Sequence, residues 1–164
     1  MTYYEQLTKA MTNLAKHPKT VFIGQNMLYP GQKMNASFDG VPMSKRIEFP
    51  VAEDFQMGFC TGLSLEGYIP ICCYPRIDFM LLASNQLVNH LDKMTGLKPK
   101  VIIRVAVGST KPLNPGPQHT QDHTEAFSLM LKTVPVVEFE PGVYEDALMG
   151  SGPVVVVERM EMYG

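Results

Sequence analysis

The sequence has few of the features that mark membrane, secreted or nucleic-acid-binding proteins. No apolar stretch approaches the roughly 20 residues needed to cross a bilayer. The first five residues, Met1 to Glu5, lack the charged and apolar regions of a signal peptide. The formal net charge is −2, and the basic residues are scattered rather than grouped in runs. This composition argues against a nucleic-acid partner and against binding to an anionic membrane surface.

Cysteine is also scarce. The chain has three cysteines, Cys60, Cys72 and Cys73, all inside apolar segments. Because neighbours in a strand point to opposite faces, Cys72 and Cys73 are poor disulfide partners for each other. We therefore expect buried free thiols, which suit a reducing cytoplasm. The sequence has no Cys-x-x-Cys pair and no spaced Cys/His set, so it predicts no metal site in this chain.

The 164 residues, 45% of them apolar, suffice for one domain with a substantial core. Short apolar segments, typical of buried strands, alternate with segments that have helical spacing or helix-capping residues. We predict strands at 20–23, 46–51, 68–74, 101–107, 136–139 and 153–158, helices at 3–14, 54–66, 78–93 and 123–132, and a helical turn at 144–149. This alternation favours a doubly wound, mostly parallel α/β sheet with helices on both faces.

Two long segments rich in glycine and proline, 25–45 and 108–122, separate these elements. Structureless loops of this length in a compact domain are usually functional. Ligands of parallel sheets bind at the carboxyl ends of the strands. We therefore expect residues 25–45, Glu53, residues 74–79 and residues 108–122 to share one rim of the sheet.

One segment and the residues that follow it resemble a known family. The pattern is Phe49-Pro50-Val51-Ala52-Glu53, then Gly58, Gly62, Gly67, Pro70-Ile71-Cys72, Phe79, Gln86, Gln118-His119-Thr120-Gln121, Glu145-Asp146-Ala147, and Pro153 to Glu158 with Met162-Tyr163-Gly164. Together these residues resemble the N-terminal, pyrimidine-binding (transketolase-like) domain of the β subunit of 2-oxo-acid dehydrogenases of the pyruvate and branched-chain type. The likeness covers essentially the whole chain.

The resemblance implies roles for five residues. In that family thiamine diphosphate lies between two domains, of which one holds the aminopyrimidine ring and the other holds the diphosphate with its Mg²⁺. Glu53 would hydrogen-bond a ring nitrogen and favour the tautomer that deprotonates the thiazolium carbon. Phe79 would stack on the pyrimidine, and Val51 and Pro75 would line the same pocket. His119 would sit by the reacting centre and handle protons of the substrate.

The residues can also be interpreted without the family. A carboxyl at the end of an apolar strand suits proton transfer, but the local sequence around Glu53 equally fits a helix cap. Phe79 alone fits a core aromatic. His119 stands in a glycine- and proline-rich loop on the expected rim, which makes it a better functional candidate than a core histidine. We interpret His17 and His90 as structural.

The diphosphate half of the site has no counterpart in the sequence. There is no Gly-Asp-Gly followed by a distant Asn, which is the family's usual Mg²⁺–diphosphate signature, and no phosphate-binding glycine loop replaces it. We therefore interpret residues 1–164 as a single pyrimidine-binding domain of a split thiamine-diphosphate enzyme. A second subunit would supply the diphosphate and Mg²⁺ half, and we expect the chain to self-associate in a two-plus-two assembly.

Several departures from the family leave the substrate open. Gly24 is followed by Gln25-Asn26, where relatives often have an acidic pair, and the stretch between Ala147 and Pro153 is shorter than usual. The leading hypothesis is a subunit that acts on a small 2-oxo acid by decarboxylation, with transfer to a lipoyl group, an aldehyde or a proton. A split decarboxylase of the sulfopyruvate decarboxylase type and a non-catalytic regulatory partner are the alternatives. Retention of Glu53, Phe79 and His119 together favours an enzyme.

Overall fold

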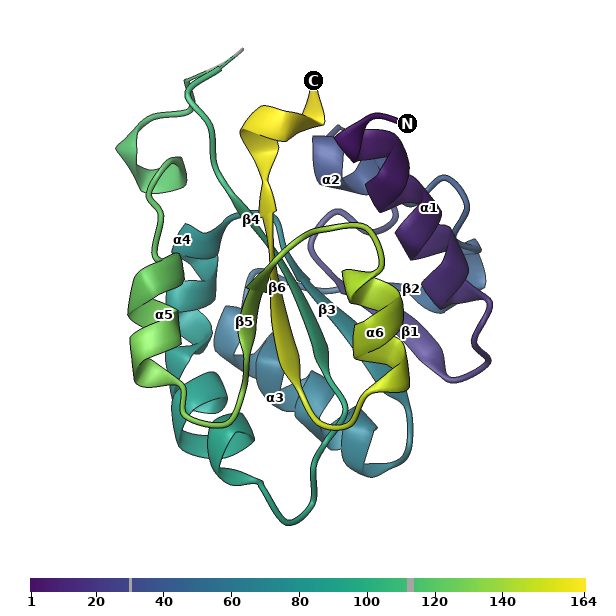
Figure 1. The fold of residues 1–164 in the computed structure, drawn as a ribbon, viewed down its shortest axis with the longest axis vertical. Helices are drawn as coiled ribbons and strands as arrows, with labels where there is room; N and C mark the ends of the chain where they lie inside the picture. The colour runs from purple at the N-terminus through teal and green to yellow at the C-terminus, as the bar shows by residue number, and fades with distance from the viewer. Residues whose placement is uncertain (30, 112–113) are drawn as a thin grey trace.

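A computed structural model describes residues 1–29, 31–111 and 114–164, and Pro30, Pro112 and Leu113 of the two predicted loops lie outside the described residues. The chain forms a parallel sheet with helices packed on both faces (Figure 1). The strands are β1 (Thr20–Gly24), β2 (Arg46–Glu48), β3 (Ile69–Tyr74), β4 (Ile102–Val107), β5 (Val136–Glu138) and β6 (Val154–Arg159). Their order across the sheet is β2-β1-β3-β4-β6-β5, and every pairing is parallel. The predicted doubly wound α/β fold is confirmed.

Each face of the sheet carries its own set of helices (Figure 1). One face is covered by α1 (Tyr3–Ala15), α2 (Lys33–Ala36) and α6 (Val143–Met149), and the other by α3 (Glu53–Leu65), α4 (Ile77–Met80) and α5 (Thr124–Met130). Neighbouring strand residues enter opposite cores, as Phe22 and Ile23 do. Burial on both faces explains why β3 and β4 are almost entirely apolar.

The first helix forms as its sequence predicts. The hydroxyl of Thr2 accepts a hydrogen bond from the N–H of Glu5, and the Glu5 carboxylate accepts one from the N–H of Thr2 at 2.7 Å. This capping box satisfies two of the free N–H groups at the helix start. The helix then buries Leu7, Met11 and Leu14 against the sheet.

The predicted helix at 78–93 is helical throughout, but it is not one regular α-helix. After α4 the chain continues through a 3₁₀ turn, η2 (Leu81–Ala83), a π-helical stretch, η3 (Asn85–His90), and a second 3₁₀ turn, η4 (Leu91–Lys93). The inward residues Ala83, Leu87 and Leu91 are four apart and all buried. Residues four apart share one face of a helix, so these three side chains all pack into the core.

The two predicted loops also contain short helices. Residues 25–45 include α2 and a 3₁₀ turn, η1 (Met43–Lys45), and residues 108–122 include η5 (Pro117–His119). A further 3₁₀ turn, η6 (Met160–Tyr163), follows β6. The first segment is not structureless because buried Met34 and Phe38 tie it to the core. Strand β2 ends earlier than predicted, just before Phe49-Pro50, since proline has no N–H for the ladder.

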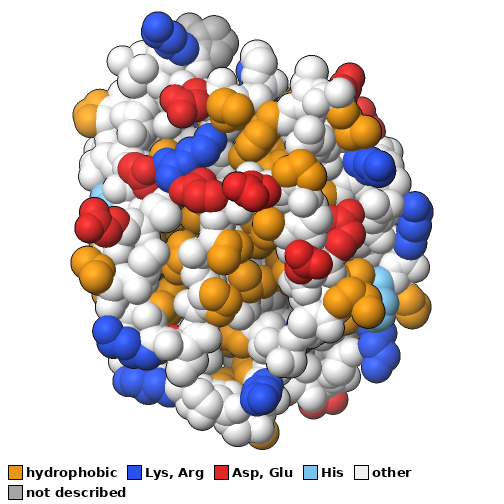
Figure 2. Space-filling model, viewed as in Figure 1, with side chains coloured by type: hydrophobic (Ala, Val, Ile, Leu, Met, Phe, Trp, Pro, Cys, Tyr) orange, Lys and Arg blue, Asp and Glu red, His pale blue; other side chains and the backbone are white. Residues whose placement is uncertain are grey.

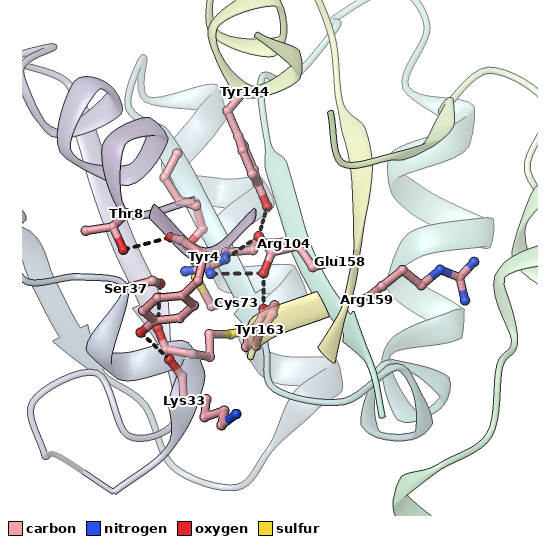
Figure 3. A network of polar contacts seen from close by, with 12 residues as sticks. Tyr4, Thr8, Lys33, Ser37, Cys73, Arg104, Tyr144, Glu158, Arg159 and Tyr163 are labelled. Carbon is pink, nitrogen blue, oxygen red and sulfur yellow. Dashed lines mark hydrogen bonds and ion pairs between the residues drawn. The ribbon is translucent and has the colours of Figure 1, made fainter. Parts of the chain in front are cut away.

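A buried polar cluster joins β4 to β6 (Figure 3). Arg104 donates two hydrogen bonds to the Glu158 carboxylate, and the hydroxyls of Tyr144 and Tyr163 donate to the same group from α6 and η6. Burial alone would lower the pKa of Arg104, but the charge of Glu158 outweighs it and raises that pKa well above its ordinary value. The Arg104 guanidinium therefore keeps its charge inside the fold.

Among the described residues, no helix is long and apolar enough to span a membrane. The three cysteines are buried and free. Within the same part of the chain, no three His, Cys, Asp or Glu side chains group in a way that could hold a metal ion.

Candidate functional site

The carboxyl ends of β3, β4 and β6 border a cavity of about 380 Å³. Its walls come from four segments that are distant in the sequence. They are Gly31 to Met34 at the start of α2, Pro75, Arg76 and Phe79 after β3, Ser109, Lys111, Pro115 and His119 after β4, and Met160 after β6. The predicted rim therefore exists, and it is hollowed where the segments after β3 and β4 meet.

Phe79 and His119 meet in this cavity. Their ring centroids are 5.4 Å apart and the ring planes are nearly perpendicular, at 86°. This is the edge-to-face arrangement that aromatic rings prefer. Pro75 lines the same cavity, so the structure brings together three of the residues predicted from the sequence.

The loop that carries His119 is held at several points. Gly108 lies so close to the backbone of His119 that a Cβ at this glycine would be 1.7 Å from the His119 carbonyl oxygen. At the end of the loop, Asp122 forms an ion pair with Arg159, which also pairs with Glu138. Acidic and basic side chains lie side by side over this face of the molecule (Figure 2). These contacts fix the loop, and with it His119, against β4, β5 and β6.

Glu53 is placed by a different set of contacts. It is 5% exposed, and its Oε1 accepts a hydrogen bond from Nε2 of Gln25 at 3.0 Å. Its backbone carbonyl accepts from the hydroxyl of Tyr74 at 2.9 Å. Ala52, rather than Glu53, is the N-cap of α3, and no side chain caps this helix. Glu53 is therefore the first residue of α3 but does not cap it, and its buried carboxyl lies against Gln25 at the end of β1.

Glu53 and the cavity are neighbours along the rim but are not one pocket. Glu53 is not among the residues that line the cavity. The link between them is Tyr74, which hydrogen-bonds the Glu53 backbone and directly precedes Pro75. The structure thus places the predicted residues in two groups along one edge of the sheet.

Val51 belongs to neither group. Its side chain is 78% exposed and does not line the cavity. Close to it in sequence, Phe55 and Phe59 are exposed on α3 and pack against Phe49, with ring centroids 5.3 and 5.4 Å from that of Phe49. The chain therefore presents an apolar surface of Val51, Phe55 and Phe59 beside Glu53.

The cavity is lined by cations that the sequence analysis did not select. They are Lys33, Arg76 and Lys111, and no Asp or Glu is among the described lining residues. Arg76 could have been found in the sequence, because it is a charged residue two positions after a fully buried strand. Gln25 has the same kind of signal, since it directly follows Gly24 at the end of β1.

Comparison with known proteins supports the resemblance. No protein-family model matches the sequence. The chain is 27% identical to "Pyruvate dehydrogenase E1 component subunit beta, mitochondrial" of Chaetomium thermophilum, in an alignment that covers 99% of this chain and 46% of that protein. Among solved structures, "Split gene transketolase, inactive beta4 tetramer" matches with a TM-score of 0.70 and 20% identity, over 94% of this chain and 50% of that chain.

These matches confirm the predicted likeness at two levels. The sequence is similar to that of a pyruvate dehydrogenase E1 β subunit, and the sheet with its helices has the fold seen in the split transketolase. The chain spans about half the length of both of these relatives. It is thus an α/β domain with the fold seen in the split transketolase, and it is similar in sequence to a pyruvate dehydrogenase E1 β subunit.

Proposed function

We propose that residues 1–164 form the pyrimidine-binding domain of a split thiamine-diphosphate-dependent enzyme that acts on a small 2-oxo acid. The observation that carries the proposal is the buried carboxyl of Glu53, held by Gln25 on the same rim as the Phe79–His119 cavity. The similarity to a pyruvate dehydrogenase E1 β subunit supports the same function.

The described residues fit an aminopyrimidine ring. Such a ring needs a hydrogen-bonding partner for a ring nitrogen and apolar or aromatic groups for its faces. Glu53 offers Oε2, which has no hydrogen-bond partner in the described part of the chain. Phe79 is only partly buried and offers its ring, with Pro75 beside it in the same cavity.

Each residue has a separate task in this proposal. Glu53 holds a proton at the ring nitrogen and takes it back, as a general acid and base. Phe79 stacks on the ring and Pro75 limits its position, while exposed Val51 adds apolar contact on the outer side. His119 moves a proton at the reacting atoms of the substrate. The cofactor, when bound, supplies the carbanion chemistry that side chains alone cannot provide.

We propose that a second subunit holds the diphosphate and its Mg²⁺. The proposal rests on the missing Gly-Asp-Gly signature and on the apolar surface of Val51, Phe55 and Phe59 beside Glu53. Exposed apolar side chains gathered next to a site are typical of an interface. The solved relative is described as a β4 tetramer, which supports self-association, and we propose a two-plus-two assembly. A permanent complex of this kind buries on the order of 2,000 Å² or more.

Co-expression tests the proposal. The chain is produced alone and together with a Gly-Asp-Gly-containing chain sought among its genomic neighbours, and each preparation is titrated calorimetrically with thiamine diphosphate and Mg²⁺. We expect a stable complex that binds the cofactor at micromolar or lower concentration and decarboxylates a 2-oxo acid. The chain alone is expected to show no such site. Micromolar binding by the chain alone would contradict the split site.

A further inference from the structure

We propose that the cavity beside Phe79 and His119 is an oxyanion site built around Arg76, which binds the anionic group of the enzyme's small-molecule substrate. The inference deepens the proposed function and rests on it for the identity of the substrate. The chemistry that the site recognises is a carboxylate or a phosphate group.

Arg76 presents a free hydrogen-bonding edge. Its Nη1 donates to the carbonyl of Pro75 at 3.0 Å and contacts the sulfur of Met160. Its Nε and Nη2 have no hydrogen-bond partner among the residues that the structure describes. These two nitrogens form the edge of a guanidinium that binds an oxyanion at two points. The guanidinium is therefore held through Nη1, and its Nε–Nη2 edge is available to a ligand.

The charges around the cavity are unbalanced. Lys33 and Lys111 share its lining with Arg76, and the described lining residues include no carboxylate. Burial lowers the pKa of Arg76, and the neighbouring side chains of Tyr163 and Asp78 offset this effect only in part. A half-buried cation without full compensation favours an anionic ligand, since the ligand supplies the missing charge.

The two lysines are secondary donors. The Lys33 ammonium contacts the carbonyl of Gly164, and Lys111 is exposed at the cavity mouth. Both are long, flexible side chains that act as point charges. Among the described lining residues, only Arg76 combines partial burial, a fixed position and two free donors, so it determines where the anion sits.

The position of Arg76 relates the anion to the proposed chemistry. Arg76 and Phe79 lie on one short segment after β3, and the Phe79 ring contacts His119. The cavity of about 380 Å³ suits a small molecule. An anion held by Arg76 would orient the substrate in the cavity that also holds His119. We therefore assign Arg76 to substrate positioning and not to proton transfer.

The site can be tested on the chain alone, because the described lining residues, Arg76 among them, belong to this chain. Isotope-labelled protein is titrated with inorganic phosphate and with acetate at constant ionic strength, and the backbone amide signals of Arg76 and Ser109 are followed by NMR. We expect saturable shifts for the wild-type chain and at least tenfold weaker binding for Arg76→Gln. Arg76→Lys should fall between them, because an ammonium cannot bind at two points.

The control is Lys93→Gln, which removes an equal charge from an exposed position in η4 outside the cavity. It should change the affinity less than twofold, and equal urea unfolding curves show that all variants are folded. Tighter phosphate than acetate binding would identify a phosphate-bearing substrate, and the reverse a carboxylate. No saturable binding by the wild-type chain, or equal binding by Arg76→Gln, would overturn the inference.

A second readout separates this inference from the proposed function. In the assembled enzyme, Arg76→Gln should raise KM for the substrate at least tenfold with little change in kcat or in cofactor affinity. An unchanged KM would reject the role of Arg76 and leave the thiamine function standing. Anion binding at Arg76 in a chain that forms no thiamine-binding complex would reject the function and keep the oxyanion site.

Discussion

Arg104 in β4 and Glu158 in β6 form a two-point ion pair that is completely buried. Nε of Arg104 lies 2.7 Å from Oε1 of Glu158, and Nη2 lies 2.9 Å from Oε2. The guanidinium also lies over the ring of Phe38, 5.0 Å from its centroid. Two charges without access to water are stable only while each compensates the other, so the fold depends on both.

Removing one member of this pair should destabilise the domain strongly. We expect Arg104→Met or Glu158→Gln to lower the free energy of unfolding by about 3–5 kcal/mol, because each leaves the other charge uncompensated. The double variant should recover much of the loss. Urea unfolding of the four proteins measures the coupling. Single variants that each cost less than about 1 kcal/mol would show that the pair contributes little.

Asp92 links η4 to the turn between α5 and β5. Burial alone would raise the pKa of its carboxyl, but hydrogen bonds from the N–H groups of Thr133, Val134 and Lys132 lower it below the ordinary value. A carboxylate with several such donors stabilises the turn that precedes β5. Hydrogen bonds to charged groups contribute about 1.5–3 kcal/mol each.

We predict that this contribution depends on pH. Because the pKa of folded Asp92 lies below that of the unfolded chain, near 3.9, the stabilisation is fully present above that unfolded value. It is lost as the pH falls through the lower folded pKa. The difference in unfolding free energy between wild type and Asp92→Asn should be constant from pH 7 to about 5 and shrink below about 4. Urea unfolding across this range tests the sign, and a difference that grows on acidification would contradict it.

The sequence predicted those helices and strands whose hydrophobic pattern fits only one type of secondary structure. The capping box and apolar stripe defined α1, and near-continuous apolar runs defined β3 and β4. The change from α-helical to 3₁₀ and π turns after Phe79 could not be predicted. Residues 78–93 contain neither proline nor glycine to mark it. The early end of β2 had a signal in Pro50, which has no N–H to donate to the sheet.

The site was predicted in outline but not in its contacts. Because ligands of parallel sheets bind at the carboxyl ends of the strands, the sequence predicted that Pro75, Phe79 and His119 share one rim. In the structure the three residues line one cavity. The Gln25–Glu53 hydrogen bond joins residues 28 positions apart and depends on how β1 lies beside β2. Sequence spacing carries no information on such a contact.

For Glu53 we predict a loss of activity without a loss of fold. Glu53→Gln keeps the size of the side chain but cannot exchange a proton with a ring nitrogen. In the assembled enzyme turnover should fall at least about 100-fold, within the range of general acid–base effects. Glu66→Gln, at the exposed end of the same helix, is the control. Near-normal turnover by Glu53→Gln would remove this residue from the chemistry.

For His119 we predict that its removal lowers the reaction rate more than the affinity for the cofactor. His119→Ala removes the imidazole from the edge of Phe79 but leaves Glu53 and Gln25 in place. The rate on the oxo acid should fall about 100-fold or more, while the calorimetric affinity for thiamine diphosphate changes by only a few fold. The opposite order, with cofactor binding lost and the rate preserved, would place His119 against the cofactor and away from the substrate.

The last prediction concerns Gln25, the only side-chain donor to the Glu53 carboxylate among the described residues. Gln25→Met has a similar length but no donor, so Oε1 of Glu53 loses the contact that orients it. We expect turnover of the assembled enzyme to fall about tenfold, which corresponds to about 1.4 kcal/mol and to one hydrogen bond with a charged group.

A residue that acts through Glu53 should lose its effect when Glu53 is already changed. The double variant Gln25→Met with Glu53→Gln should therefore be no slower than Glu53→Gln alone. Gln6→Met in α1 is the matched control, because Gln6 donates only to the carbonyl of Met1 at the start of the chain. Additive losses in the double variant would show that Gln25 acts independently of Glu53, through its own contact with the ligand.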